Sequence, residues 1–287
     1  MCNKRDILDR FYTNPEVAEN CTNIFKELIN ITQKDLIIEP SIGSGNFLSS
    51  ISNITKNYLG YDIDNSLFNP EYIKTEYKNK VFLQDFLSLD YSKLQNEYNN
   101  IYILGNPPFG KQSSIAIKFI KHMCHFCTAF GLILPKSFKK QSLQDKIPLD
   151  FSNILTIDIP ENSFSYIDTS TNVSTIFCIY IKTKLREKHK KLKPINYEFV
   201  NRDKEYDISV RRVGINAGEI DIYKNYISKS IQSHYFIKFT NKYIDKDEIV
   251  KQLKTIEFLE RLYTVGPRSI SKQELINKFN NILNITK

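Results

Sequence analysis

The stretch of sequence that decides the fold is DLIIEPSIGSG, residues 35–45. It begins with a short apolar run of the kind that forms a buried strand, and it continues through Gly43 and Gly45. Two glycines one residue apart let the backbone turn sharply and approach a ligand closely at the start of the following helix. The stretch therefore predicts a strand, a ligand-binding turn and a helix, in that order.

Similar apolar runs recur on both sides of this stretch, and segments of helical length separate them. Further strands are expected at residues 58–61, 81–83, 101–104, 131–134, 154–157 and 175–181. Helices are expected at residues 15–29, after Gly45, and at residues 114–126. No helix of useful length separates the last two strands, so an antiparallel hairpin is expected to close the sheet. The expected fold class is α/β, with a doubly wound, Rossmann-like sheet.

The composition of the chain excludes several classes of protein. Of its 287 residues, 41% are apolar and 25% charged, which is typical of a globular chain and not of a collagen-like or low-complexity one. No apolar run approaches the ~20 residues needed to cross a bilayer. No apolar segment follows the N-terminal MCNKRD, and the five cysteines are scattered. These observations predict a cytoplasmic protein without a secretory signal.

The charge of the chain is unevenly distributed. Residues 1–184 carry 19 Lys and Arg and 19 Asp and Glu, whereas residues 185–287 carry 21 and 13. Codon bias explains the overall excess of lysine equally well, but it does not explain this contrast. We therefore expect a catalytic domain over residues 1–184 and a smaller basic α+β region over residues 185–287 that binds a polyanion. The stretch KTKLREKHKK, residues 182–191, is the expected linker.

Acidic residues stand where two later strands are expected to end. Asp62 is placed to accept hydrogen bonds from a ribose diol, and Asp85 can accept one from an adenine amino group, with Phe86 beside the ring. Either acid alone fits a solvated strand end better than a ligand contact. Together with Glu39 and the glycine turn, they predict a nucleoside-bearing ligand. A nicotinamide cofactor is excluded, because the third glycine of that fingerprint is replaced by Leu48.

The most specific motif is NPPF, residues 106–109, at the end of the fourth expected strand. Two consecutive prolines restrict the backbone and remove two N–H donors, which gives the carbonyl groups a defined direction. Asn106 Oδ1 and the Pro107 carbonyl can both accept from one planar NH2 group, and Phe109 can stack on the ring that carries it. A rigid Pro-Pro turn without function is the alternative interpretation.

In combination, these motifs resemble those of S-adenosylmethionine-dependent enzymes that methylate adenine N6. Three further segments resemble that family: FYTNPEVA at residues 11–18, GLILPKSF at residues 131–138 and NVSTIF at residues 172–177. The order of the motifs resembles that of the gamma class of DNA adenine methyltransferases. The resemblance covers residues 11 to about 182 and implies the seven-stranded class I methyltransferase sheet.

The resemblance also implies roles for individual residues. Thr13 and the glycine turn would surround the methionine part of the cofactor, and Asp62 would hold the ribose. The full set of implied cofactor contacts is Thr13, Glu39, Pro40, Gly43, Gly45, Asp62, Ile63, Asp85, Phe86 and Asn106. The implied catalytic set, which holds the target base, is Asn106, Pro107, Pro108 and Phe109. On the other side of the base we expect Phe164, with Tyr166 as the rival.

The basic region contains a second candidate contact surface, SVRRVGINAG at residues 209–218. Adjacent arginines on a strand point to opposite faces, so Arg211 or Arg212 can reach a phosphate or a base, and Asn216 can donate from a turn. A hairpin with exposed cations is an equally good interpretation. Another strand is expected at residues 233–239. Helices are expected at residues 247–262 and 272–283, the second capped by Ser271 with Glu274 three residues later.

A zinc site at His122, Cys124, His125 and Cys127 is not expected. No second cysteine pair stands at a suitable spacing, and the stretch has the pattern of an amphipathic helix. We therefore predict no metal.

The sequence predicts transfer of a methyl group from S-adenosylmethionine to adenine N6 in DNA. The nearest alternative is an RNA adenine methyltransferase, because Asn-Pro-Pro-Phe also occurs in enzymes that modify RNA. Protein glutamine methyltransferases use a similar turn, but they carry a helical domain ahead of the glycine turn. A catalytically silent nucleic-acid-binding subunit is the remaining alternative, and the intact NPPF motif argues against it.

Overall fold

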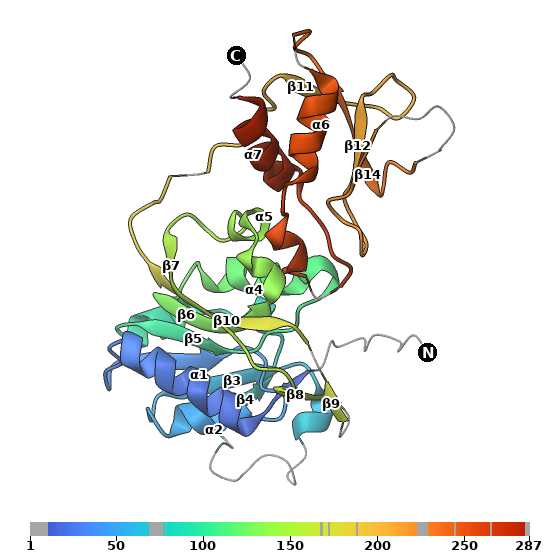
Figure 1. The fold of residues 1–287 in the computed structure, drawn as a ribbon. Coiled ribbons are helices and arrows are strands. Elements are labelled where there is room, and N and C mark those ends of the chain that lie inside the picture. Colours follow the sequence, from blue (N-terminus) through green and yellow to red (C-terminus); the bar gives the residue numbers. More distant parts are fainter. Residues whose placement is uncertain are drawn as a thin grey trace. The chain divides into compact units, whose positions relative to one another are not determined.

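The computed structural model describes residues 11–284, except 69–76, 78, 167–168, 172, 188, 223–228, 244 and 265. The chain forms two compact units, described separately below (Figure 1). Unit 1 comprises Met1–Phe138 and Leu143–Lys188, and unit 2 comprises Lys139–Ser142 and His189–Lys287. The N-terminal MCNKRD lies outside the described residues.

The core of unit 1 is a seven-stranded sheet, within the described residues, of order β4-β3-β2-β5-β6-β10-β7. Its strands are β2 (Leu36–Glu39), β3 (Tyr58–Asp62), β4 (Val81–Leu83), β5 (Ile101–Gly105), β6 (Ala129–Pro135), β7 (Phe151–Asp158) and β10 (Thr175–Lys182). The strands from β4 to β6 are parallel, and β10 pairs antiparallel with both β6 and β7. The seven expected strands and the closing antiparallel pair are confirmed, and so is the Rossmann-like α/β fold class.

Helices cover both faces of this sheet (Figure 1). The helices of unit 1 are α1 (Pro15–Leu28), α2 (Asn46–Ser52), α3 (Ser92–Glu97) and α4 (Ser114–Met123), and the short α5 (Gln141–Gln144) spans the boundary between the units. Successive strand residues point to opposite faces. Accordingly, Ile37 belongs to the apolar cluster that includes Phe25 of α1, whereas Ile38 belongs to the cluster that includes Phe119 of α4. None of the described helices has the length and apolar character that a bilayer span requires.

Unit 1 also contains a small sheet that the sequence did not predict. Its strands are β1 (Tyr12–Thr13), β8 (Phe164–Tyr166) and β9 (Thr169–Thr171). Thr13 pairs with Phe164 across β1 and β8, and the backbone N–H of Asn14 donates to the Ser163 carbonyl at 2.9 Å. This pairing holds residues 12–14 beside the carboxyl edge of the large sheet, where Thr13 lines the pocket described below.

Unit 2 is a four-stranded antiparallel sheet, within the described residues, with two helices. The strands, in the order β11-β14-β12-β13, are β11 (Tyr197–Val200), β14 (His234–Phe239), β12 (Ile208–Arg211) and β13 (Ile220–Ile222). The helices are α6 (Lys246–Lys254) and α7 (Lys272–Leu283). Ile237, Leu253 and Phe279 lie in their common core. The expected capping box of α7 is confirmed, because Ser271 Oγ accepts from the Glu274 N–H at 3.1 Å.

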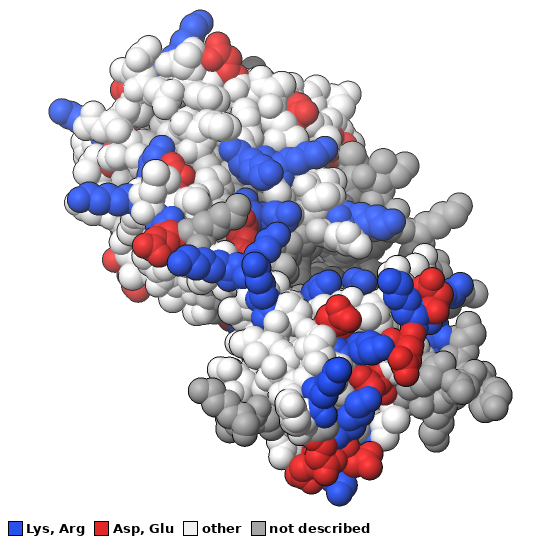
Figure 2. Space-filling model, turned by 90° about the horizontal axis from the view of Figure 1, so that it is seen from above, with Lys and Arg blue, Asp and Glu red and all other residues white. Residues whose placement is uncertain are grey.

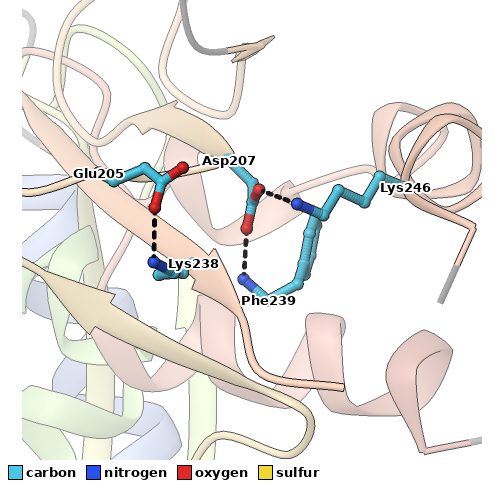
Figure 3. A network of polar contacts seen from close by, with 5 residues as sticks. All are labelled: Glu205, Asp207, Lys238, Phe239 and Lys246. Atoms are coloured by element: carbon cyan, nitrogen blue, oxygen red, sulfur yellow. Dashed lines mark hydrogen bonds and ion pairs between the residues drawn. The ribbon is translucent and has the colours of Figure 1, made fainter. Parts of the chain in front are cut away.

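Several charged side chains of unit 2 form hydrogen bonds and ion pairs within the unit (Figure 3). Asp207 accepts from the Phe239 N–H at 2.7 Å and from Lys246 Nζ at 2.7 Å, while Lys238 pairs with Glu205 at 2.8 Å. These contacts connect β14 and the start of α6 to the segment before β12. Two of the cations in the basic region are therefore already compensated by acids.

The expectation of one helix over residues 247–262 is wrong. Helix α6 ends at Lys254, and only a short 3₁₀ turn, η6 (Leu259–Leu262), follows. The reason is tertiary packing: Phe258 is 2% exposed, and its ring lies against Gly218. The chain leaves the helix to bury this ring, and periodicity alone does not reveal that.

This contact makes a stability prediction for Gly218→Ala. Gly218 has a φ of +103°, and a Cβ there would lie 2.9 Å from Phe258 Cδ2. Backbone strain and overlap should together destabilise unit 2 by about 1–3 kcal/mol, measured by urea unfolding. Gly266→Ala is the matched control, because a Cβ at Gly266 meets nothing within 4 Å. Equal stability of the two variants would contradict the prediction.

Candidate functional site

A pocket lies at the carboxyl edge of the large sheet, where the strand order changes direction. Strand β2 has β3 on one side and β5 on the other, so the strand order reverses at β2. In doubly wound sheets, ligands bind at the carboxyl ends of the strands at such a switch point. The predicted site residues that line the pocket are Thr13, Glu39, Pro40, Gly43, Asp62, Ile63, Asp85, Phe86, Asn106, Pro107, Pro108 and Phe109. Gly45 does not line it; with a φ of +78°, Gly45 instead forms the turn that starts α2.

The glycine turn is held against two neighbours. Gly43 adopts a φ of +53°, and its N–H donates to Asp62 Oδ2 at 2.9 Å. A Cβ at Gly43 would lie 3.0 Å from Tyr12 Cδ1, so the absence of a side chain permits both the turn and the close approach of β1. The turn is therefore connected to the end of β3 on one side and to β1 on the other.

Two carboxyl groups, those of Asp62 and Glu39, line the pocket and differ in their hydrogen bonding. Asp62 Oδ1 accepts from the Asp64 N–H at 2.9 Å, and burial raises the pKa of Asp62 despite its backbone donors. Glu39 is 2% exposed, and burial, then the nearby charge of Asp62, raises its pKa well above the ordinary value. Glu39 Oε2 has no hydrogen-bond partner among the described residues. A buried, unpartnered oxygen beside a pocket fits a ligand that brings a donor.

Asp85 and Phe86 also line the pocket. Asp85 is exposed, and its Oδ1 accepts from the Leu87 N–H at 2.9 Å. The Phe86 ring is 1% exposed and stacks on Phe119, with ring centroids 5.4 Å apart. Phe86 therefore forms part of the pocket wall rather than an exposed platform for a ring.

Asn106 is held by three hydrogen bonds, two to its carboxamide and one to its backbone. Its Nδ2 donates to the Phe11 carbonyl at 3.0 Å and to Thr13 Oγ1 at 3.1 Å. Ser41 Oγ donates to the Asn106 backbone carbonyl at 3.0 Å. Asn106 Oδ1 is buried and has no partner among the described residues. Both amide hydrogens are thus used, and the oxygen remains to accept from a ligand.

The Phe109 ring is held near a second aromatic ring that sequence reasoning missed. Phe11 and Phe109 have ring centroids 6.4 Å apart, with an interplanar angle of 21°, and both line the pocket. The Phe109 carbonyl accepts from the N–H groups of Ile115 and Ala116, which connects the Pro-Pro turn to α4. The only signal for Phe11 was its place at the head of the FYTNPEVA segment.

The residue expected on the other side of the target base does not line the pocket. Phe164 is 1% exposed and lies in the apolar cluster that also contains Phe109. The side chain of its rival, Tyr166, lies outside the part of the chain that the structure describes. A contact between Phe164 and a base would require β8 to rearrange, and the assignment stays a prediction.

The candidate contacts of unit 2 lie at one end of β12. Arg211 is exposed at the last position of the strand, and Arg212 follows it with its guanidinium 5.0 Å from the centroid of the Tyr235 ring. Asn216 is exposed in the turn after Gly214. On the face drawn in Figure 2, Lys and Arg side chains lie in several groups with acidic side chains between them. Such a surface fits separate phosphate contacts better than one continuous basic band.

The His and Cys residues between the motifs are placed in the packing of unit 1. His122 lies against the rings of Phe86, Tyr91 and Phe126. Cys124 and Cys127 are buried. In the part of the chain that the structure describes, no group of three or more His, Cys, Asp or Glu residues could hold a metal ion.

Comparison with known proteins gives one family match. The family model described as ribosomal RNA adenine dimethylase matches residues 3–147. No curated protein matches the chain.

Solved structures of low sequence identity also match. A suggested RNA methyltransferase from Pyrococcus horikoshii is 17% identical with a TM-score of 0.47, over 63% of this chain and 91% of that one. A suggested class I S-adenosylmethionine-dependent methyltransferase from Listeria monocytogenes is 14% identical with a TM-score of 0.48, over 66% of each chain. A dimethyladenosine transferase from Plasmodium falciparum is 15% identical with a TM-score of 0.44, over 61% of this chain and 64% of that one.

Proposed function

Since the chain belongs to the family of ribosomal RNA adenine dimethylases, we propose that it transfers methyl groups to the N6 amino group of adenine in RNA. The chain is an adenine methyltransferase that depends on S-adenosylmethionine. The sequence alone favoured DNA as the substrate, with RNA as the alternative. The family match supports the alternative, since a ribosomal RNA family model covers half of the chain, including the NPPF motif.

The observation that carries the proposal is the buried Asn106 Oδ1, which has no hydrogen-bond partner among the residues that the structure describes. A buried acceptor costs free energy unless a donor reaches it, by about 1–3 kcal/mol. An exocyclic NH2 group is such a donor, and the Pro107 carbonyl beside it can accept the second hydrogen. Two acceptors in this arrangement draw the lone pair of the amine out of conjugation with the ring. The nitrogen then becomes nucleophilic, and its proton can leave after it has attacked, so no strong base is required.

The residues around the pocket fit the cofactor. Glu39 Oε2, which no described residue contacts by a hydrogen bond, and the partly buried Asp62 line the same pocket, and the glycine turn leaves room beside them. Asp62 would hold the ribose, Asp85 would accept from the adenine amino group, and Thr13 and Gly43 would border the methionine part. When bound, S-adenosylmethionine supplies a methyl group already activated by its positive sulfur. The chain's own task is to align the amine and to exclude water.

The target base would enter beside Phe109. An adenine in a paired region must leave its stack, which costs a few kcal/mol that stacking on an aromatic ring can offset. Bases in single-stranded loops and bulges of RNA are already partly unstacked, so this cost is lower there. Arg211, Arg212 and Asn216 of unit 2 would contact the phosphates and the flanking bases.

Tritiated S-adenosylmethionine tests the proposal directly. The protein would be incubated separately with ribosomal RNA transcribed in vitro, duplex DNA and protein extract. We expect label in the RNA alone, and mass spectrometry of the digested nucleosides should place it at adenine N6. The same spectra would distinguish one added methyl group from two. Label in DNA alone would contradict the choice of RNA, and binding of the cofactor without label in any acceptor would support the silent subunit.

A further inference from the structure

Thr13 contacts three parts of unit 1: the NPPF motif, helix α2 and strand β8. It is the second residue of β1, and its side chain is 5% exposed at the edge of the pocket. Its hydroxyl accepts from Asn106 Nδ2 at 3.1 Å, and its backbone carbonyl accepts from Asn46 Nδ2 at 2.8 Å. Its backbone also pairs with Phe164 of β8. Thr13 is therefore held by its own backbone, independently of its contact with Asn106.

Two hydrogen bonds of Nδ2 hold the Asn106 carboxamide, and together they keep its oxygen toward the pocket. Nitrogen and oxygen of a carboxamide exchange places when the group turns by half a rotation. The Phe11 carbonyl can only accept, so a turned amide would place its oxygen against that acceptor and its NH2 group in the pocket. An NH2 group there would repel the amine of the target base. The Thr13 hydroxyl accepts the second hydrogen of Nδ2 and holds the carboxamide in place.

We propose that Thr13 is a positioning residue that keeps Asn106 Oδ1 directed at the target amine. This role differs from the cofactor contact that the sequence resemblance implies for Thr13. The two roles are compatible, because the hydroxyl accepts from Asn106 and its hydrogen can still donate to the cofactor. The inference rests on the proposed function, because it assigns Thr13 to the same reaction. It predicts an effect on the rate of methyl transfer rather than on binding of the cofactor.

The test compares Thr13→Val with Thr13→Ser. Valine keeps the shape and the strand preference of threonine but removes the acceptor, whereas serine keeps the hydroxyl. With ribosomal RNA transcribed in vitro, we expect Thr13→Val to lower kcat by about tenfold or more, and Thr13→Ser to stay near the wild-type value. The dissociation constant of S-adenosylmethionine, measured by calorimetry, should change less than about twofold in both variants, because both keep the backbone and the Cβ of residue 13 that would border the methionine part. Thr22→Val is the matched control, because Thr22 is also buried and its hydroxyl donates to the Ala18 carbonyl of its own helix.

A second measurement does not depend on activity. The side-chain amide hydrogens of Asn106, assigned by NMR, should exchange with solvent faster in Thr13→Val and at the wild-type rate in Thr13→Ser. Unchanged exchange in Thr13→Val would overturn the proposal, and so would a loss of cofactor affinity with an unchanged kcat. If the wild-type protein methylates no RNA, the proposed function fails, while the amide exchange still decides whether Thr13 holds Asn106.

Discussion

Replacement of Asn106 by alanine should abolish methyl transfer while leaving the affinity for S-adenosylmethionine nearly unchanged. The variant removes Oδ1, the buried acceptor without a partner among the described residues. Loss of one preorganised polar group at a reacting centre typically costs 10²–10³-fold in rate, and we expect about 1000-fold here. The target amine would keep its contact with the Pro107 carbonyl but would stay conjugated with its ring. Tritium transfer to RNA measures the rate, and calorimetry measures the affinity for the cofactor.

A matched control separates this effect from a general loss of stability. Asn57→Ala also removes a carboxamide that donates to a backbone carbonyl, that of Gln33 at 2.7 Å, but Asn57 lies outside the pocket. It should retain full activity. Turnover by Asn106→Ala at the wild-type rate would refute the role of Oδ1 and, with it, the strongest support for the proposed function.

The large sheet and most of the pocket could be predicted from sequence because both depend on local signals. Buried parallel strands such as β2, β5 and β6 are short apolar runs, and their carboxyl ends are marked by Glu39 and Asn106. In a doubly wound sheet these ends meet at one edge, so linear spacing is enough to bring their side chains together.

The residues that orient Asn106 could not be found in this way. The Phe11 carbonyl and the Thr13 hydroxyl are 95 and 93 positions away from Asn106 in the chain. Thr13 belongs to a two-residue strand and Phe11 directly precedes it, so the segment is too short to show any periodicity. The end of helix α6 at Lys254 was missed for a related reason. It depends on the burial of Phe258 against Gly218, which is a contact between segments distant in the sequence. Tertiary contacts of this kind leave no pattern in the neighbouring sequence.

The second large effect is expected for Asp62→Ala, which should weaken binding of S-adenosylmethionine by about 30- to 100-fold, or about 2–3 kcal/mol. The variant removes the carboxylate expected to hold the ribose, and it leaves the N–H groups of Gly43 and Asp64 without their acceptor. The glycine turn is then less well ordered before the cofactor arrives. Because the charge of Asp62 helps to raise the pKa of Glu39, that pKa should fall in the variant.

Asp90→Ala is the matched control for Asp62→Ala. Asp90 also accepts from a backbone N–H two residues later, that of Ser92 at 3.0 Å, but it is exposed and lies outside the pocket. Its loss should leave cofactor binding unchanged. At saturating S-adenosylmethionine, Asp62→Ala should recover much of its kcat, because Asn106 and Phe109 are intact. Asn106→Ala should recover none, so the two variants separate binding of the cofactor from activation of the amine. Normal cofactor affinity in Asp62→Ala would contradict the ribose assignment but leave the role of Asn106 standing.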